Sequence, residues 1–172
     1  QIVFNRRDRL PVWADGATQR ALLARFDYAF VQPEGSPYPP ILEMHTIGGA
    51  PFTIDGAGGP ITLTPFEVDH GSIDALGFRI GQVAYLPDVI RIPEASWAHL
   101  QGLDCWILDA LRRTPHPTHA HLDLALEWIA QARPKQAVLT NMHIDLDHDI
   151  VAAETPDHIR PAYDGMVLRY AL

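Results

Sequence analysis

The chain has 172 residues, of which 47% are hydrophobic and 20% are charged, and its net charge at pH 7 is −8. This composition is typical of a globular domain and excludes a disordered chain. The apolar runs are too short for a membrane helix, which needs about 20 residues. The acidic balance argues against a general nucleic-acid binder. The single cysteine, Cys105, excludes an internal disulfide and fits the cytoplasm, where we expect the protein.

The first half of the chain is predicted to be rich in strands. Apolar or alternating residues predict strands at 10–14, 41–47, 52–54, 61–68, 75–80 and 82–86, the last two as a hairpin around Gly81. Between the first two strands, Thr18 is expected to cap a helix over residues 19–26.

The second half alternates between helices and strands. Pro93 is expected to begin a helix that ends near Leu100. Further on, the pattern predicts strands at 105–111 and 137–140, an amphipathic helix at 122–132, a short helix at 147–153 and a closing strand at 166–172. This order predicts an α/β architecture, in which helices pack on a mixed sheet.

Three predicted strands are followed by a side chain that binds metals. The segments are Val68-Asp69-His70-Gly71, Ala84-Tyr85-Leu86-Pro87-Asp88 and Leu139-Thr140-Asn141-Met142-His143. Rigid strand ends are a common way to hold histidine and carboxylate ligands around a first-row metal. Each of the three also fits a turn, cap or core residue when taken alone, but the same pattern occurs three times.

A histidine-rich loop at residues 115–123 is a second candidate. His121 opens the predicted helix at 122–132 and could act as a general acid or donate a hydrogen bond to a phosphate. Asp123 could orient His121 or cap the helix, whereas His116 and His119 have weaker claims. The alternative is a surface loop without a catalytic role. The acidic run after His143 is interpreted as a polar loop and a helix start.

These segments together resemble the metallo-β-lactamase-fold hydrolases, most closely the branch of the cyclic phosphodiesterase of phosphonate utilisation and the coenzyme-PQQ synthesis protein B. The resemblance follows the order of the family from about Pro11 to the end of the chain. It rests on these segments: Asp69-His70-Gly71, Ala84-Tyr85-Leu86-Pro87-Asp88, Leu108-Asp109-Ala110-Leu111-Arg112, His121-Leu122-Asp123-Leu124, Leu139-Thr140-Asn141-Met142-His143 and Tyr163-Asp164-Gly165-Met166.

The resemblance implies an αββα sandwich with two divalent metal ions, zinc or manganese, at one edge. His70 would bind the first ion, Asp88 would bridge both and take part in catalysis, and His143 would bind the second. His121 would assist the phosphate or the leaving group. A metal-bridging hydroxide would attack a small phosphodiester, because bound metal lowers the pKa of water from about 15.7 to about 7.

The chain departs from the family in one respect, since the His-x-His-x-Asp-His segment that supplies most other ligands is absent. The run His119-Ala120-His121-Leu122-Asp123-Leu124 imitates that segment but ends in leucine and follows Asp88. We therefore expect residues 1–172 to be the C-terminal part of a single metallo-β-lactamase-like domain, truncated at its N-terminus. Such a fragment alone should bind metal weakly and be inactive.

The sequence thus predicts a metal-dependent hydrolase, and a phosphodiesterase is the favoured activity. A lactonase, a thioesterase and a tRNA-processing nuclease are also compatible with the fold. The alternative from another class is a non-catalytic carrier or binding protein for a small metabolite. We expect a small-molecule phosphoester as the partner and neither membrane nor nucleic acid, and a homodimer is left open.

Overall fold

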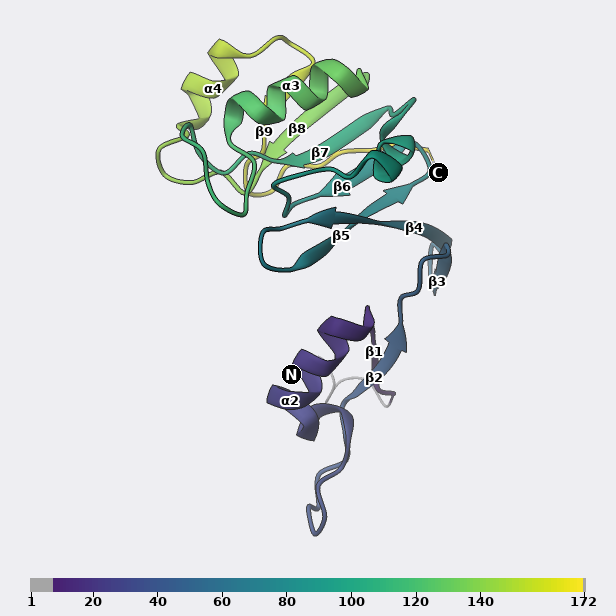
Figure 1. The fold of residues 1–172 in the computed structure, drawn as a ribbon. Coiled ribbons are helices and arrows are strands. Elements are labelled where there is room, and N and C mark those ends of the chain that lie inside the picture. Colours follow the sequence, from purple (N-terminus) through teal and green to yellow (C-terminus); the bar gives the residue numbers. More distant parts are fainter. Residues whose placement is uncertain (1–7, 172) are drawn as a thin grey trace. The chain divides into compact units, whose positions relative to one another are not determined.

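The computed structural model describes residues 8–171, which fall into two compact units (Figure 1). The first unit comprises residues 1–50 and the second residues 51–172. The expectation of one domain over residues 1–172 stays a prediction.

The first unit contains one helix and a two-stranded parallel sheet. Strand β1 (Leu10–Ala14) pairs with β2 (Leu42–Thr46), and helix α2 (Gly16–Phe30) connects them. The Asp15 carboxylate accepts hydrogen bonds from the backbone N–H groups of Ala17 and Thr18, at 2.7 and 2.8 Å. Asp15 is therefore the N-cap, and the predicted cap at Thr18 was wrong. The first N–H groups of a helix have no partner within the helix, and a carboxylate at the N-cap position is close enough to accept from them.

The second unit is built on a seven-stranded sheet with the order β3-β4-β5-β6-β7-β8-β9. Strands β3 to β6 pair in antiparallel fashion, and β6 to β9 are parallel. The strands are β3 (Phe52–Gly56), β4 (Gly59–Asp69), β5 (Asp74–Ile80), β6 (Val83–Leu86), β7 (Cys105–Asp109), β8 (Gln136–Thr140) and β9 (Ile159–Pro161). The helical elements are η1 (Glu94–Leu100), α3 (Leu122–Ala132) and α4 (His148–Glu154).

Five of these strands end at the same edge of the sheet, which we call the carboxyl edge. Strands β4 and β6 are both antiparallel to β5 and so run in the same direction. Strands β7, β8 and β9 are parallel to β6. Residues that follow these strands are therefore brought together, although they lie far apart in the chain. Such edges are where open α/β sheets bind ligands.

The core lies between the sheet and helix α3, which covers β7 and β8 in Figure 1. Alternate residues of β6, β7 and β8 face it, among them Leu86, Trp106 and Leu139, all fully buried. Helix α3 contributes its apolar face, in which Leu122, Ala125, Trp128, Ile129 and Ala132 are buried. Burial of this interface fixes the loops that leave the strands at the carboxyl edge.

The sequence located most elements of the second unit but not its last strand. The hairpin at Gly81, the helix at 122–132 and the buried strands were predicted. The helix predicted to begin at Pro93 is the 3₁₀-helix Glu94–Leu100, with Pro93 at its N-cap position. Asp147 caps α4 through the N–H groups of Asp149 and Ile150. The closing strand predicted at 166–172 was wrong over residues 166–171, which form no strand, and residue 172 lies outside the described part. The sheet ends instead with β9, which is only three residues long.

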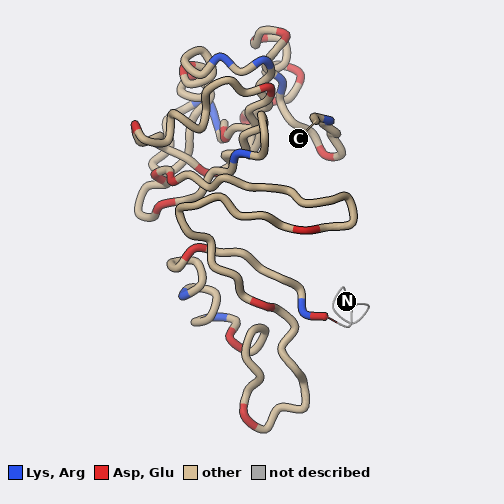
Figure 2. Tube along the Cα trace, turned by 90° about the vertical axis from the view of Figure 1, so that its right-hand side faces the viewer, with Lys and Arg blue, Asp and Glu red and all other residues tan. Residues whose placement is uncertain are grey.

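The described residues include no helix long and apolar enough to cross a membrane. Lysine and arginine positions form only short, separated segments along the trace in Figure 2. The whole sequence has 21 acidic and 13 basic residues.

Candidate functional site

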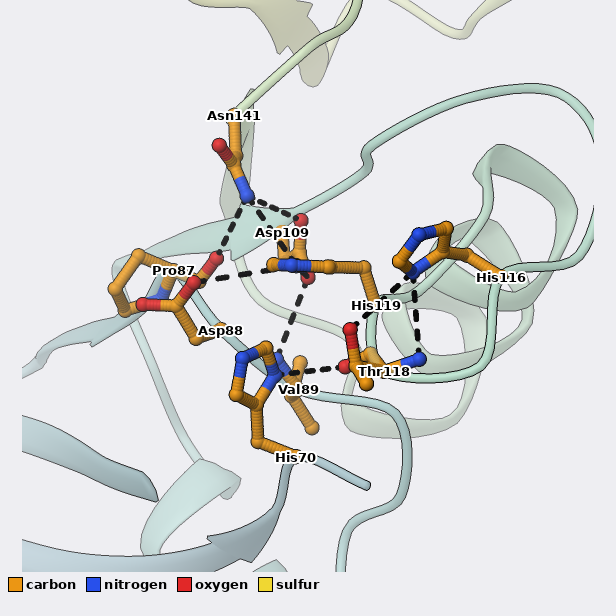
Figure 3. Close-up of polar contacts among 9 residues, drawn as sticks. All are labelled: His70, Pro87, Asp88, Val89, Asp109, His116, Thr118, His119 and Asn141. Atoms are coloured by element: carbon orange, nitrogen blue, oxygen red, sulfur yellow. Dashed lines mark hydrogen bonds and ion pairs between the residues drawn. The ribbon is translucent and has the colours of Figure 1, made fainter. Parts of the chain in front are cut away.

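Three side chains at the carboxyl edge form a group that could hold a metal ion, here called the ligand cluster. It consists of His70, Asp88 and His119, whose ligand atoms lie within 4.8 Å of one another (Figure 3). His70 directly follows β4, and Asp88 follows β6 by two residues. His119 comes from the loop between β7 and α3. Two of the three residues were predicted as metal ligands from the sequence.

The ring of His70 is held in one orientation. Its Nδ1 atom lies 2.8 Å from the carbonyl oxygen of Thr118. A carbonyl only accepts, so Nδ1 carries the proton and Nε2 keeps its lone pair. A backbone carbonyl on the far nitrogen is the usual partner of a metal-binding histidine.

The approach of the His70 loop to Thr118 depends on Gly71. Its φ is +83°, a region that favours glycine. A Cβ atom at this position would lie 2.6 Å from Cγ2 of Thr118 and 3.2 Å from the carbonyl oxygen of Pro117. Only glycine lets the two loops come this close, and so Gly71 helps to place His70 against the Thr118 carbonyl.

Asp69 connects the loops that carry His70 and Asp88. Its carboxylate accepts from Nε and Nη2 of Arg91, at 3.0 and 2.7 Å, and from the N–H of Gly71, at 2.9 Å. Its backbone also pairs with Arg91. The Gly71 N–H and then the Arg91 guanidinium hold the pKa of this carboxyl group below its ordinary value. Asp69 therefore stays ionised and keeps the two loops together.

His119 is paired with a buried carboxyl group. Its Nδ1 atom lies 2.9 Å from Oδ2 of Asp109, the last residue of β7, and 3.9 Å from Oδ1 of Asp88. The Asp109 side chain is fully buried. Burial raises the pKa of the Asp109 carboxyl group, while the hydrogen bond from His119 opposes the rise. One proton is shared in the contact between Oδ2 of Asp109 and Nδ1 of His119, and Nε2 is the ring nitrogen left for other partners.

Two further donors support Asp109 from neighbouring strands. The backbone N–H of Val89 lies 3.3 Å from Oδ2, and Nδ2 of Asn141 lies 3.3 Å from Oδ1. Nδ2 of Asn141 is also 3.4 Å from the carbonyl oxygen of Pro87. Asn141 has a φ of +61°, a conformation that asparagine tolerates better than most residues. It therefore joins the ends of β6, β7 and β8.

The other two predicted site residues lie outside the ligand cluster. His143 is 59% exposed, and its Nδ1 atom lies 3.1 Å from Oδ1 of Asp145. His121 occupies the N-cap position of α3 without a side-chain cap bond, and its Nδ1 atom is buried with no hydrogen-bond partner in the described structure. The roles of His143 as a metal ligand and of His121 in catalysis stay predictions.

Sequence reasoning gave His119 only a weak claim and assigned no role to Asp109 or Asn141. Asp109 had a usable signal, since it ends an apolar strand in the same way as Asp88. His119 and His121 are two residues apart in an irregular loop, so their directions could not be read from the sequence. The role of Asn141 depends on a positive φ, which no pattern of hydrophobicity reports.

The donors of the ligand cluster suit a divalent first-row metal. Imidazole nitrogen and carboxylate oxygen are ligands of zinc, and they suit manganese as well. The free Nε2 of His70 and the half-exposed Asp88 carboxylate, with a side-chain exposure of 48%, are accessible to an ion. The residues present therefore fit such an ion, although three ligands are few for two ions.

Comparison with known proteins places the chain among the β-lactamase-like proteins. Residues 2–144 match the family model of the beta-lactamase superfamily domain. The chain is 34% identical to a protein whose structure is described as a new diphosphatase from the PhnP family, with a TM-score of 0.83 over 96% of this chain and 60% of that chain. This chain thus spans about three fifths of the length of the diphosphatase. A search of curated proteins finds no match.

Two more distant structures share the fold. Zn²⁺-bound PqqB from Methylobacterium extorquens is 14% identical, with a TM-score of 0.69 over 98% of this chain and 68% of that chain. The metallo-β-lactamase fold protein YhfI from Bacillus subtilis is 16% identical, with a TM-score of 0.67 over 92% of this chain and 64% of that chain. The predicted metallo-β-lactamase fold is confirmed.

Proposed function

Because the chain belongs to the beta-lactamase superfamily and has the metallo-β-lactamase fold, we propose that it is part of a metal-dependent hydrolase of small phosphodiesters. The observation that carries the proposal is the ligand cluster together with the His119–Asp109 pair. The 34% identity to a diphosphatase supports chemistry at a phosphoryl centre. The alternative of a metabolite-binding protein predicts the same fold without turnover.

In this proposal His70 and Asp88 hold the divalent ions, and His143 joins them as a further ligand. The ions, zinc or manganese, would polarise the phosphoryl oxygens and lower the pKa of bound water. The Thr118 carbonyl keeps the Nε2 lone pair of His70 available. The His-x-His-x-Asp-His segment expected to supply the remaining ligands is not among these 172 residues.

His119 is the side chain best placed to transfer a proton to the leaving oxygen. Asp109 fixes its tautomer and stabilises the imidazolium form, as a buried carboxylate does in other acid–base pairs. The leaving alkoxide would take its proton from Nε2. His121 was predicted for this role, and the two histidines can be distinguished experimentally.

The test compares single variants of the longest product of the reading frame that contains this chain. His70→Ala and Asp88→Ala should lose metal, measured by elemental analysis, and lose hydrolysis of bis-(p-nitrophenyl) phosphate. His119→Gln should keep the metal and lose about 10²-fold or more in kcat with an alkyl phosphodiester, whose leaving alkoxide needs a proton, and much less with the nitrophenyl ester. His121→Gln should retain both. Loss of activity in His121→Gln alone would assign the proton transfer to His121 instead.

Two outcomes would contradict the proposal. A wild-type protein with no more than trace metal, unchanged by Asp88→Ala, would exclude a metal-dependent hydrolase. A protein that binds metal through His70 and Asp88 but hydrolyses no phosphoester would favour the binding protein. Metal loss in His119→Gln would instead make His119 a ligand.

A further inference from the structure

A cavity of about 430 Å³ lies beside the ligand cluster at the carboxyl edge. It is lined by residues 139–142, at the end of β8, and residues 162–164, after β9. Asn141 belongs to both places, because it lines the cavity and also contacts Asp109. We call this space the edge cavity. Its volume is sufficient for a small organic group bound next to the reacting phosphorus.

The charged groups that line the edge cavity are negative only. Its lining contains one ionisable carboxyl group, Asp164, and no lysine, arginine or histidine. The other polar groups are the hydroxyls of Thr140 and Tyr163 and the amide of Asn141. A second phosphate or a carboxylate placed here would meet the negative charge of Asp164, and the lining itself offers no cation to compensate, which disfavours an anionic group.

Asp164 and Tyr163 together suit a group that donates hydrogen bonds. A carboxylate accepts from paired hydroxyl groups, as in ribose recognition, or from an ammonium group. The Tyr163 ring, which is 60% exposed, offers an apolar face for the carbon skeleton of the same group. Hydroxyl-bearing and amino-bearing alcohols share this chemistry.

We propose that the edge cavity binds the alcohol esterified to the phosphorus, and that Asp164 selects alcohols that donate hydrogen bonds and carry no negative charge. The inference rests on the proposed phosphodiesterase function. It narrows the substrate class from any small phosphodiester to esters of neutral polyols or amino alcohols. It places the phosphorus at the ligand cluster and the alcohol along the edge, from the end of β8 towards the residues after β9.

The test uses four 4-nitrophenyl phosphodiesters that share the nitrophenolate leaving group. Each enzymatic rate is compared with the rate of the same ester in metal-containing buffer without protein, because the 2-hydroxyl of glycerol can itself attack phosphorus. The second alcohol is ethanol, glycerol, 2-aminoethanol or 3-hydroxypropionate. We expect kcat/KM for the glycerol or aminoethanol ester to exceed that of the ethyl ester about tenfold, the size of one charged hydrogen bond. The carboxylate ester should be the poorest substrate. Comparison of the glycerol ester with the aminoethanol ester shows whether the cavity prefers hydroxyl groups or an ammonium group as the hydrogen-bond donor.

The variant that tests the assignment is Asp164→Asn. It should remove most of the preference for the donor-bearing ester and improve the carboxylate ester, while the ethyl ester changes little. Asp55→Asn removes an equal charge from an exposed position of β3 and should leave the order unchanged. The same preference in Asp164→Asn as in the wild type would refute the role of Asp164.

A binding measurement keeps the inference testable if no ester is hydrolysed, an outcome that counts against the proposed function. Calorimetry then compares non-hydrolysable analogues of glycerol phosphate and ethyl phosphate, in which a methylene group replaces the oxygen between phosphorus and the alcohol carbon. Tighter binding of the glycerol compound that disappears in Asp164→Asn would support the edge cavity as its site. Equal binding of both compounds to the wild type would overturn the inference on its own.

Discussion

Oδ2 of Asp109 lies 2.9 Å from Nδ1 of His119, and this contact connects a fully buried carboxyl group to the edge of the ligand cluster. Burial of an ionised carboxylate is costly unless donors surround it. Here the donors come from His119, Val89 and Asn141. The hydrogen bond that helps to offset the burial of Asp109 therefore also holds His119 in place at the site.

Replacing Asp109 by asparagine should affect activity more than stability. The amide oxygen of the substituted side chain can still accept from His119, but its NH2 group would face Nδ2 of Asn141, so we expect the free energy of unfolding to fall by about 1–2 kcal/mol. Turnover should fall about 10–100-fold, because the charge that supports the imidazolium is removed. Asp109→Ala should also cost about 2–4 kcal/mol of stability by leaving Val89 N–H and Asn141 without their acceptor.

Denaturant unfolding and steady-state kinetics measure the two effects. Asp104→Asn is the matched control, since Asp104 immediately precedes β7 and forms only an exposed ion pair with Lys135. It should leave turnover unchanged. Equal turnover in Asp109→Asn and wild type would show that Asp109 is structural only.

Gly71→Ala should disturb the His70 loop. The added Cβ would meet Cγ2 of Thr118, and φ is positive, so we expect a loss of about 1–3 kcal/mol in stability. The double variant Gly71→Ala/Thr118→Ser removes the obstructing methyl group and should recover part of the loss. If the double variant is no more stable than Gly71→Ala, the close contact with Thr118 is not the cause.

Asp15 should stabilise helix α2 in a pH-dependent way. The Thr18 N–H in particular lowers the pKa of the Asp15 carboxyl group. A lowered carboxyl pKa contributes stability above the unfolded pKa of about 3.9 and loses it as the pH falls through the folded value. Asp15→Ala should cost about 1 kcal/mol at neutral pH and much less in strong acid.

Amide hydrogen exchange of α2 measures this effect. Asp15→Asn keeps a capping acceptor and serves as the control, with a smaller loss at neutral pH. An equal loss for Asp15→Ala at neutral and acid pH would contradict an ionised cap.

Tyr170 should be the last tyrosine to ionise. Burial is the main cause that raises the pKa of its phenol to about 12. The hydroxyl donates a hydrogen bond to Oε1 of Gln136 at 2.5 Å. Its contribution to stability is full below the unfolded pKa of about 10 and is lost as the pH rises towards about 12. A titration of phenolate absorbance should show one late step among five tyrosines. Tyr170→Phe should abolish this step, and Tyr28→Phe should leave it in place.

Much of the parallel part of the second unit could be predicted because β7 and β8 are apolar and largely buried on both faces. Segments such as Cys105–Asp109 and Gln136–Thr140 have no polar alternation to misread, and helix Leu122–Ala132 has a clear apolar face. Strand Ile159–Pro161 was missed because three residues carry no detectable period and one of them is proline.

The site was predicted to the extent that it lies at strand ends. His70 and Asp88 follow β4 and β6 closely, so their shared edge could be anticipated. His119 lies ten residues beyond the end of β7, in a loop whose path is set by contacts with His70, Asp109 and Asn141. Such contacts are long-range in the chain and leave no local signature.

The residues that make up the ligand cluster and its supports, from Asp69 to Asn141, occupy one uninterrupted stretch of the second unit. Recombination could therefore exchange these residues as one segment, although His143, the further ligand of the proposed metal centre, lies just outside it. Residues outside that stretch, such as Tyr163 and Asp164, would then be free to diverge separately. Related proteins could keep one reaction centre and acquire different selectivity through changes in a short segment near the C-terminal end.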